Sequence, residues 1–508
     1  MDRNVFRSMF SVFVMGVVLV LAAGAGRVLA DTVVYPEDGF TVLQNAVDAG
    51  GKVLLKALTR DGAPMSVKVP NNTHLFMGYY GNPVTLEGEV VGAYQSTVWG
   101  DTFSQKNVVW IKSGGVTIRN LVITAKYPRD GAIWMRGDGM DAGTHPNSGG
   151  AIVIENNIIF SEQYGIGGQR TGGWPLVIRG NRITVDGDSR TVENIGVKLY
   201  NTGYWVDAGG VKNDPWTWTP AATPVEISDN VVSVTNPALI GYVTDGIRVE
   251  GWTVVGYDLE AEWGDNGPIS IVGNSVSVNA ALFKPAIGVA VSRTFSGTDN
   301  CRVQNNVLSG TCNIGILRSA YGGNNRITDN DLSGVQAVIP MVILGHDSVV
   351  SDNVFGPLAF PWGALILESA HVHPGACPMP LPTTNCVIMN NDYRKTGAAG
   401  WVDEGGGVPA NGCVMIDSEV DMWGWGTGMG MEVKDNLISE TGRFPVGTGG
   451  PKNQVYELNL STPPLCYENR IVGLPANHVM KPGVGQKIKQ ARQAGGFLLL
   501  KGTVTTEE

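Results

Sequence analysis

A short phrase built around asparagine recurs along this chain and constrains its fold more than any other feature. Between residues 301 and 355 the phrase occurs as VQNNVL, ITDNDL and VSDNVF, with Asn306, Asn330 and Asn353 at the same position. The Asn-to-Asn spacing is in the low twenties of residues, and a second apolar run follows each phrase. A fixed period that holds two short β-type runs predicts a solenoid of stacked coils.

The phrase continues in both directions. Further copies centre on Asn157, Asn181, Asn230, Asn274, Asn391 and Asn436. Asn tolerates left-handed backbone and hydrogen-bonds its own turn, so we expect these side chains to stack and bond along the axis at one corner of every coil. The flanking Val, Ile and Leu are expected to point inward, about 4.8 Å from their equivalents. We therefore predict a structural Asn row that holds no catalytic residue.

The first 30 residues have the pattern of a secretory signal peptide. Arg3 and Arg7 precede an apolar core, and Val28 and Ala30 form a small-residue cleavage pattern before Asp31. The alternative is an uncleaved N-terminal anchor. No other run approaches the roughly 20 apolar residues of a membrane span. We expect a secreted, periplasmic or cell-surface protein with no membrane span once the signal is removed.

Two further segments follow the signal. Residues 31–440 are predicted to form the β-helix domain of about ten coils, and residues 441–508 a C-terminal cap or irregular segment. Phe40 to Ala49 has apolar residues at helical spacing and stops at Gly50-Gly51. Because the end of a solenoid exposes unpaired strand edges, we expect this helix to cap the N-terminal end.

Composition agrees with this organisation and narrows the partners. The chain has 508 residues, of which 16% are charged and 69 are Gly, as in a β protein with many tight turns. Its formal net charge is −10, whereas a nucleic-acid partner requires a basic stripe. We therefore exclude nucleic acid as a partner.

The repeat resembles that of the right-handed parallel β-helix group, the pectin-lyase-like superfold, over about residues 31–440. The resemblance implies an all-β fold and a group that includes polysaccharide lyases, polygalacturonases, epimerases and phage tailspikes. The catalytic patterns of these enzymes are missing: Asp-Asp, Gly-His-Gly and Asp-Pro-His-Asp do not occur. Fold alone does not fix function, so whether the protein is an enzyme stays open.

Candidate site residues emerge when the strands after the Asn phrases are aligned on their Gly, as in IGVKLY and DGIRVEG. Side chains alternate along a strand, which places Lys198 beside Arg248 and Tyr200 beside Glu250 on one outer face. In a lyase-type β-elimination, Lys198 or Tyr200 would act as base or acid and Arg248 would neutralise the substrate carboxylate. The alternative is a solvated salt-bridge patch, in which Arg248 pairs with Glu250 and Lys198 with a loop acid.

Two long excursions leave after these strands, at 201–220 and 251–268. Long loops are often functional, and aromatic faces suit the flat C–H faces of sugar rings. We therefore predict substrate-binding roles for their tryptophans, with simple packing as the alternative. These are Trp205, Trp216, Trp218, Trp252 and Trp263.

Six cysteines occur, all beyond residue 300, an even number in an exported chain. Disulfides are predicted between Cys301 and Cys312 and between Cys377 and Cys386, which leaves Cys413 with Cys466; buried free thiols are the alternative. No zinc-type spacing is present. Ca²⁺ is a candidate cofactor through Asp138 and Asp141 in GDGMDAG, with an ordinary Gly turn as the alternative.

The leading functional hypothesis is a protein that binds acidic polysaccharide and, if it is an enzyme, cleaves it by lyase-type β-elimination. A second hypothesis is a non-catalytic surface or scaffold protein that uses the long stack as a rigid presentation surface. A third is a periplasmic accessory protein that handles metal.

Overall fold

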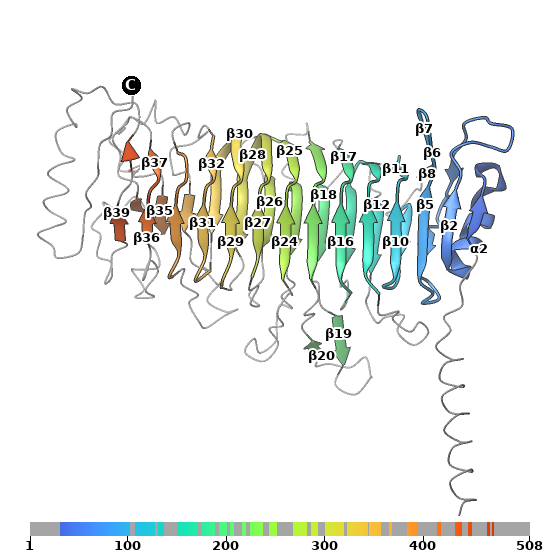
Figure 1. Cartoon of the computed structure of the whole chain (residues 1–508), viewed down its shortest axis with the longest axis horizontal. Coiled ribbons are helices and arrows are strands. Elements are labelled where there is room, and N and C mark those ends of the chain that lie inside the picture. The colour runs from blue at the N-terminus through green and yellow to red at the C-terminus, as the bar shows by residue number, and fades with distance from the viewer. Residues whose placement is uncertain are drawn as a thin grey trace, which may run out of the picture.

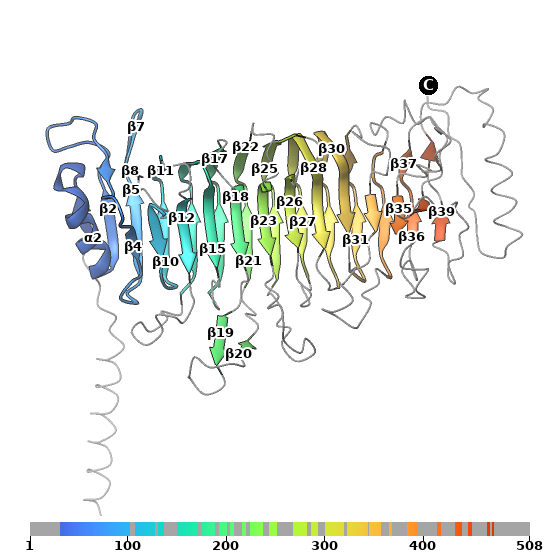
Figure 2. The ribbon, with the colours of Figure 1, turned by 180° about the vertical axis from the view of Figure 1, so that it is seen from behind.

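The fold is a right-handed parallel β-helix, seen in a computed structural model as one long stack of strands (Figures 1 and 2). The residues that the structure describes are 31–101, 107–126, 131–136, 150–169, 174–187, 193–200, 204–207, 216–219, 224–236, 243–250, 268–281, 286–292, 300–319, 323–343, 345–356, 365–367, 384–393, 414–417, 432–438, 446–449, 465–467 and 470–471. The predicted signal peptide at 1–30 lies outside them.

Each coil passes through three parallel stacks of strands, which we name faces A, B and C. Face A contains, in order, β1 (Thr32–Val34), β2 (Gly51–Leu55), β5 (Val84–Gly88), β10 (Val116–Arg119), β13 (Ile152–Glu155), β16 (Leu176–Arg179), β21 (Val225–Ser228), β24 (Ile269–Val272), β27 (Arg302–Gln304), β29 (Arg326–Thr328), β31 (Val349–Ser351), β34 (Val387–Met389), β36 (Glu432–Lys434) and β39 (Leu465–Tyr467). These form a 14-stranded sheet. The stack is therefore longer than the ten or so coils expected from the Asn phrases.

Faces B and C follow face A in each coil. Face B contains β3 (Val67–Lys68), β8 (Thr97–Gly100), β11 (Val122–Ala125), β14 (Ile158–Ser161), β17 (Arg182–Asp186), β22 (Val231–Thr235), β25 (Ser275–Asn279), the first halves of β28 (Val307–Ser319) and β30 (Asp331–Ile343), and β32 (Val354–Phe355). Face C contains β4 (Leu75–Met77), β9 (Val109–Ile111), β12 (Gly131–Arg136), β15 (Tyr164–Gln169), β18 (Glu193–Tyr200), β23 (Val243–Glu250), β26 (Ala286–Ser292), the second halves of β28 and β30, β33 (Leu365–Leu367), β35 (Val414–Asp417) and β38 (Val446–Gly449).

Two short antiparallel pairs lie outside these faces. They are β6 (Val90–Val91) with β7 (Tyr94–Gln95) and β19 (Tyr204–Asp207) with β20 (Trp216–Thr219). A further short pair, β37 (Leu437–Ile438) with β40 (Arg470–Ile471), is parallel and begins directly after Asn436. Strand β39 pairs with β36, so face A continues beyond residue 440 into the segment assigned to the cap. The boundaries of the predicted domains stay a prediction.

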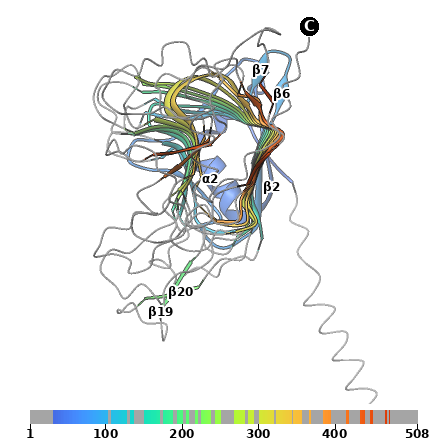
Figure 3. The same cartoon turned by 90° about the vertical axis from the view of Figure 1, so that its left-hand side faces the viewer.

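The N-terminal end is closed by a helix, as predicted. A 3₁₀ turn, η1 (Pro36–Asp38), leads into α2 (Gly39–Ala49), which ends at Gly50 with a φ of 81°. Leu43 and Val47 bury the apolar side of α2 against the first coils. In the view along the axis, α2 lies across the cross-section of the stack (Figure 3). It therefore covers edges that would otherwise be unpaired.

The core is built from rows of aliphatic side chains, one from each coil. Along face A one inward row runs through Leu86, Ile118, Ile154, Ile178 and Ile227, all fully buried and paired in register. Alternation sends the intervening residues outward. The prediction that Val, Ile and Leu stack inward on their equivalents is confirmed.

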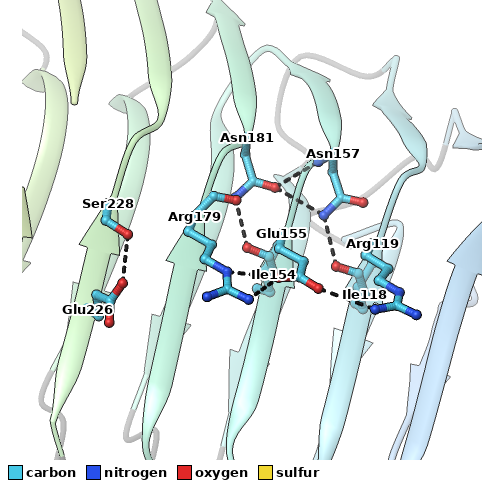
Figure 4. Close-up of polar contacts among 9 residues, drawn as sticks. All are labelled: Ile118, Arg119, Ile154, Glu155, Asn157, Arg179, Asn181, Glu226 and Ser228. Atoms are coloured by element: carbon cyan, nitrogen blue, oxygen red, sulfur yellow. Dashed lines mark hydrogen bonds and ion pairs between the residues drawn. The ribbon is translucent and has the colours of Figure 1, made fainter. Parts of the chain in front are cut away.

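The Asn row lies at the corner between faces A and B and forms a continuous hydrogen-bonded ladder. Asn157 donates from its backbone N and from Nδ2 to Oδ1 of Asn181, each at 3.0 Å. Nδ2 also donates to the carbonyl of Ile118 at 3.0 Å (Figure 4). The same pattern links the remaining members, Asn181, Asn230, Asn274, Asn306, Asn330, Asn353, Asn391 and Asn436. The predicted ladder is confirmed.

The left-handed backbone at this corner belongs to the residue before each ladder Asn rather than to the ladder Asn itself. Asn156 has a φ of 56°, Asp229 of 55° and Asp329 of 59°, and Gly180 and Gly273 hold the equivalent place in their coils. Asn, Asp and Gly are the residues that tolerate this conformation. At each corner, the residue before the ladder Asn therefore makes the turn, and the ladder Asn makes the hydrogen bonds between coils.

An ion-pair row marks the outer side of face A. Arg119 lies between Glu87 and Glu155, with N···O distances of 2.8 and 3.6 Å. Arg179 contacts Glu155 at 2.7 Å, and Figure 4 shows Glu155 between the two arginines. These residues are direct neighbours in register. Alternating charges on adjacent strands favour this pairing over a shifted one.

The predicted disulfide between Cys301 and Cys312 is wrong, because both are free buried thiols. Cys301 precedes β27 on face A, whereas Cys312 lies within β28 and pairs in register with Ala337 of β30. The two thiols therefore belong to different faces of one coil. Burial raises the pKa of Cys301, against the nearby guanidinium of Arg318, and burial raises the pKa of Cys312 to about 12.

Among the described residues, Cys386 is a third free thiol. Cys386 is a buried thiol whose Sγ lies 3.3 Å from the carbonyl oxygen of Thr384. Its predicted partner Cys377 lies outside the described residues, as does Cys413. Cys466 lies in β39. The alternative of buried thiols is the one that holds at Cys301 and Cys312.

Candidate functional site

The predicted site residues occupy adjacent strands of face C. Lys198 of β18 pairs in register with Arg248 of β23, and Tyr200 pairs with Glu250. This confirms that the four positions are neighbours in the stack. The side chains of Tyr200 and Glu250 lie outside what the structure describes.

A column of glycines shapes these strands. Gly196 and Gly246 face inward, and a Cβ on each would lie 2.5 Å from the carbonyl oxygen of the next glycine in the column. The pairing register steps over both residues. Val197 then also points inward, so Lys198 returns to the outer side. The alignment on Gly therefore gave the right outward positions.

Lys198 faces outward yet is almost fully buried, with a relative exposure of 2%. Its ammonium group forms an ion pair with Oε2 of Glu193, at the start of the same strand. Tyr164 of β15 donates its hydroxyl proton to the same oxygen at 2.6 Å. The Lys198 Nζ also lies 5.3 Å from the centre of the Tyr164 ring. Glu193 thus joins side chains from two adjacent strands.

Arg248 forms the second half of the cluster. Its Nη1 donates to Oδ2 of Asp245 at 2.6 Å, and the Asp245 side chain is fully buried. The salt-bridge alternative pairs Arg248 with Glu250, whereas the partner that the structure describes is Asp245, three residues earlier on the strand. Both cations of the predicted site therefore carry a carboxylate from their own strand.

Glu193 is held as a carboxylate. Burial acts to raise its pKa, but hydrogen bonds from Lys198 and Tyr164, together with the charges of Lys198 and Arg248, hold the pKa below its ordinary value. A carboxylate of this kind stabilises the protonated form of Lys198. The ammonium group can donate a proton or pair with an anion, and it must lose a proton before Lys198 can act as a base.

The tryptophan excursion after β18 has structure of its own. Residues 204–207 and 216–219 form the antiparallel hairpin β19–β20, which pairs Trp205 with Trp218 and Asp207 with Trp216. Figure 1 shows β19 and β20 outside the stack, below the ends of its strands. Trp252 and Trp263 lie outside the described residues.

Sequence reasoning missed three members of the cluster, Tyr164, Glu193 and Asp245. A signal was available for Tyr164: aligning YGIGG with NIGVK on their first Gly places it one coil before Ile195, as the register confirms. Glu193 and Asp245 lie before the aligned glycines, and nothing in the repeat distinguishes an outward carboxylate that is buried from one in solvent.

Neither a metal site nor a membrane span is found in the part of the chain that the structure describes. There, no group of three or more His, Cys, Asp or Glu side chains is placed to hold a metal ion. Asp138 and Asp141, named as Ca²⁺ candidates, lie outside that part. Among the described residues, no helix has the length and apolar character needed to cross a membrane.

Comparisons with known proteins find similarity in fold only. No family model matches the chain, and no curated protein does. Solved structures that match include a mannuronic-acid-specific polysaccharide family 6 lyase from human gut microbiota, at 12% identity and a TM-score of 0.47, covering 92% of this chain and 95% of that one. The A-module of a mannuronan C-5 epimerase from Azotobacter vinelandii matches at 15% identity and a TM-score of 0.41, covering 85% and 98%.

A tailspike protein, Dettilon gp208, also matches, at 11% identity and a TM-score of 0.39, covering 82% of this chain and 68% of that one. These TM-scores are below 0.5. The assignment of the fold therefore stands on the parallel sheets described above, and no activity is transferred from these proteins.

Proposed function

We propose that the protein is exported and binds an acidic polysaccharide along the outer side of face C, with Lys198 and Arg248 as the groups that meet the carboxylates. The observation that carries the proposal is the buried cluster formed by Tyr164, Glu193 and Lys198 beside Asp245 and Arg248. The core beneath it is already complete, because Val197, Leu199, Ile247 and Val249 fill the inward positions.

Buried charges of this kind are costly to desolvate and are a weak source of stability. Perturbed carboxylates with specific charged partners gather at functional sites. Lys198 and Arg248 lie one rung apart, about 4.8 Å, so they offer two neighbouring cations along the stack. The Glu193 carboxylate, whose side chain is 26% exposed, can accept hydrogen bonds from sugar hydroxyls. The cluster thus presents both donors and acceptors to a polymer of acidic sugars.

If the site is catalytic, the reaction we propose is β-elimination. A base removes the proton on the carbon next to the substrate carboxylate, the electron pair forms the new double bond, and the glycosidic oxygen leaves with a proton from an acid. Arg248 would pair with the substrate carboxylate. Lys198, held as an ammonium, suits the acid, and Tyr200 is the candidate base. Ca²⁺ is a second candidate for neutralising the carboxylate.

The tryptophan hairpin supports a polymer-binding role. Trp205, Trp216 and Trp218 lie on β19–β20, which follows β18 directly in the chain. One residue separates Trp216 from Trp218, and Trp205 is the register partner of Trp218. The three positions therefore belong to one face of the hairpin. Aromatic faces beside charged groups would stack on sugar rings. Trp252 and Trp263, after β23, are proposed to contribute in the same way.

The test is a screen of the protein from Asp31 onward against polygalacturonate, alginate and hyaluronan, with neutral dextran as a control, with and without Ca²⁺. Binding is followed by calorimetry and cleavage by absorbance of the unsaturated product. Binding of an acidic polymer and not of dextran supports the proposal, and absorbance growth identifies a lyase. Absence of binding to every acidic polymer by folded protein overturns it.

Variants then locate the site. The pair Glu193→Gln with Lys198→Met removes both charges without leaving one buried alone, and we expect a Kd at least about tenfold weaker. Arg179→Ala is the matched control, since Arg179 also pairs with a carboxylate, that of Glu155, but on face A. Equal affinity in all three proteins would place binding elsewhere.

A second candidate function is a non-catalytic scaffold that presents the stack as a rigid surface. It is favoured by the internal pairing of Lys198 with Glu193 and of Arg248 with Asp245. It is distinguished by the same screen, because a scaffold of this kind shows neither polysaccharide binding nor product.

A further inference from the structure

An outward row of aromatic side chains runs along face C and ends at the charged cluster. Phe76 of β4, Trp110 of β9 and Trp134 of β12 are register neighbours on successive strands. The row continues through Gly167 of β15 to Lys198 of β18. We name Phe76, Trp110, Trp134 and Tyr164 the aromatic strip.

The strip is continuous with the Lys198 cluster through side-chain contacts. The ring of Trp134 lies over Gly167, where an added Cβ would overlap its Cε3 atom. The Trp134 and Tyr164 rings have centroids 5.8 Å apart, and Lys198 Nζ lies 5.3 Å from the Tyr164 centroid. Because residue 167 is a glycine, the Trp134 ring can lie against the backbone of the next strand, β15.

The far end of the strip is also ordered by contacts. Trp110 stacks on Phe76 at a centroid distance of 6.2 Å and an angle of 29°. The edge-to-face ring of His74 lies 4.6 Å from Trp110, and Lys112 Nζ lies 4.2 Å from its centre. Trp110 is thus a held ring with the Lys112 ammonium group over one of its faces, where the ammonium group can meet a carboxylate of a bound sugar.

The aromatic rings are not needed to fill the core. The inward positions of the same strands are occupied by Met77, Ile111, Ile133 and Met135, all fully buried. Phe76, Trp110, Trp134 and Tyr164 are instead half-buried on the outer side. On face A the corresponding outer row is charged, with Glu87, Arg119, Glu155 and Arg179. In this part of the stack, the outward row of adjacent rungs is therefore aromatic on face C and charged on face A.

We infer that the aromatic strip is an extended binding platform for the acidic polysaccharide, on which successive sugar rings stack from the Lys198 cluster toward the N-terminal end. The inference rests on the proposed function and adds the direction and length of the bound chain. Five rungs, from β4 to β18, span roughly 19 Å. Lys112 would meet a carboxylate distant from the one at Lys198. Stacking on aromatic rings contributes to binding affinity and favours particular orientations of the two rings.

The test compares short and long oligosaccharides of polygalacturonate or alginate, whichever polymer binds more tightly, by calorimetry. We expect Trp110→Ala to weaken Kd for long oligosaccharides about tenfold and to leave Kd for dimers and trimers unchanged. Gly167→Ala, which displaces the Trp134 ring without removing it, should weaken long-chain binding in the same direction. The variant that removes the charges of Glu193 and Lys198 should weaken both lengths.

Trp99→Ala is the matched control. Trp99 of β8 is also an outward half-buried tryptophan with lysines over its ring, Lys68 at 4.8 Å and Lys126 at 4.1 Å, but it lies on face B. The Trp99→Ala variant should bind oligosaccharides of every length with the same Kd as the unaltered protein. Circular dichroism establishes that each variant is folded.

The outcomes separate the two proposals. Unchanged long-chain affinity in folded Trp110→Ala and Gly167→Ala, with weakened binding in the charge variant, overturns the strip and leaves the proposed function standing. Equal losses for short and long chains in Trp110→Ala also overturn it, because a distant platform acts only on chains that reach it. Absence of any polysaccharide binding overturns both proposals together.

Discussion

Nδ2 of Asn306 donates a hydrogen bond to Oδ1 of Asn330 across 2.9 Å, one rung along the stack. The same oxygen accepts from the Asn306 backbone N at 3.1 Å. Nδ2 of Asn330 in turn donates to the carbonyl of Val303 and to Oδ1 of Asn353. Both residues are buried. One amide therefore satisfies buried donors and acceptors in three consecutive coils.

The first prediction concerns this ladder. Asn330→Ala leaves the Asn306 donors and the Val303 carbonyl without their partner in a buried corner, so we expect the free energy of unfolding to fall by about 2–3 kcal/mol. Urea denaturation followed by circular dichroism measures it. Gln304→Ala is the control, since Gln304 also bonds to the next rung, through Thr328 at 2.8 Å, but from a half-buried outward position. A loss no greater than that of the control would contradict a stabilising ladder.

The second prediction concerns the residue before each ladder Asn. Asp329 has a φ of 59°, a conformation that costs a β-branched residue about 1–2 kcal/mol. Asp329→Val should lose at least that much stability in urea. Asp329→Gly should stay close to the unaltered protein, because Gly180 and Gly273 hold the same place in other coils. Equal stability of the Val and Gly variants would show that the conformation does not limit the corner.

The third prediction concerns Gly246 on face C. A Cβ there would lie 2.5 Å from the carbonyl oxygen of Gly288, a backbone atom fixed by the stack. We expect Gly246→Ala to cost at least about 1–3 kcal/mol. The comparison is Gly334→Ala, whose Cβ would approach no atom closer than 3.1 Å, from Leu308 O. A thermal or urea series that ranks the two variants alike would refute the steric account.

The fourth prediction concerns pH. Burial acts to raise the pKa of Glu193, but the Lys198 and Tyr164 hydrogen bonds hold it below its ordinary value of 4.5. The stability that the carboxylate contributes is therefore present above that value and is lost as pH falls through the folded-state pKa. Glu193→Gln should make the decline in stability below about pH 4.5 shallower.

The measurement is the free energy of unfolding from about pH 3 to about pH 7 in both proteins. Glu226→Gln is a suitable control, because the Glu226 carboxylate accepts a hydrogen bond from Ser228 on the outer side of face A. Parallel curves for the unaltered protein and Glu193→Gln across the acid range would disprove the assigned ion pair.

The fifth prediction concerns the cysteines. Burial raises the pKa of the Cys312 thiol to about 12 and also raises that of Cys301, and a buried thiol is inert. In folded protein at about pH 8, both should resist alkylation, as followed by mass spectrometry, and should react fully only in denaturant. Recovery of a Cys301–Cys312 peptide pair under non-reducing digestion would contradict the structure.

The sequence by itself determined the class of fold, because the repeat is local. Every ladder position from Asn157 to Asn436 was visible as a phrase with a fixed apolar frame, and the stacking of like residues follows once the coils are in register. The N-terminal helix was visible for the same reason, since a 3.6-residue pattern ended by Gly50-Gly51 lies within one short segment. The alignment of glycines also placed Lys198 beside Arg248.

Only the tertiary structure decided what those positions contact. Whether Lys198 lies in solvent or is buried, and whether its partner is a loop acid or Glu193, depends on side chains of separate coils that no period specifies. The Cys301–Cys312 pairing failed because closeness in sequence does not reveal that two residues lie on different faces of one coil. Phe76, Trp110 and Trp134 form one row only because three irregular coils, with weak phrases and unequal loops, still stack in register.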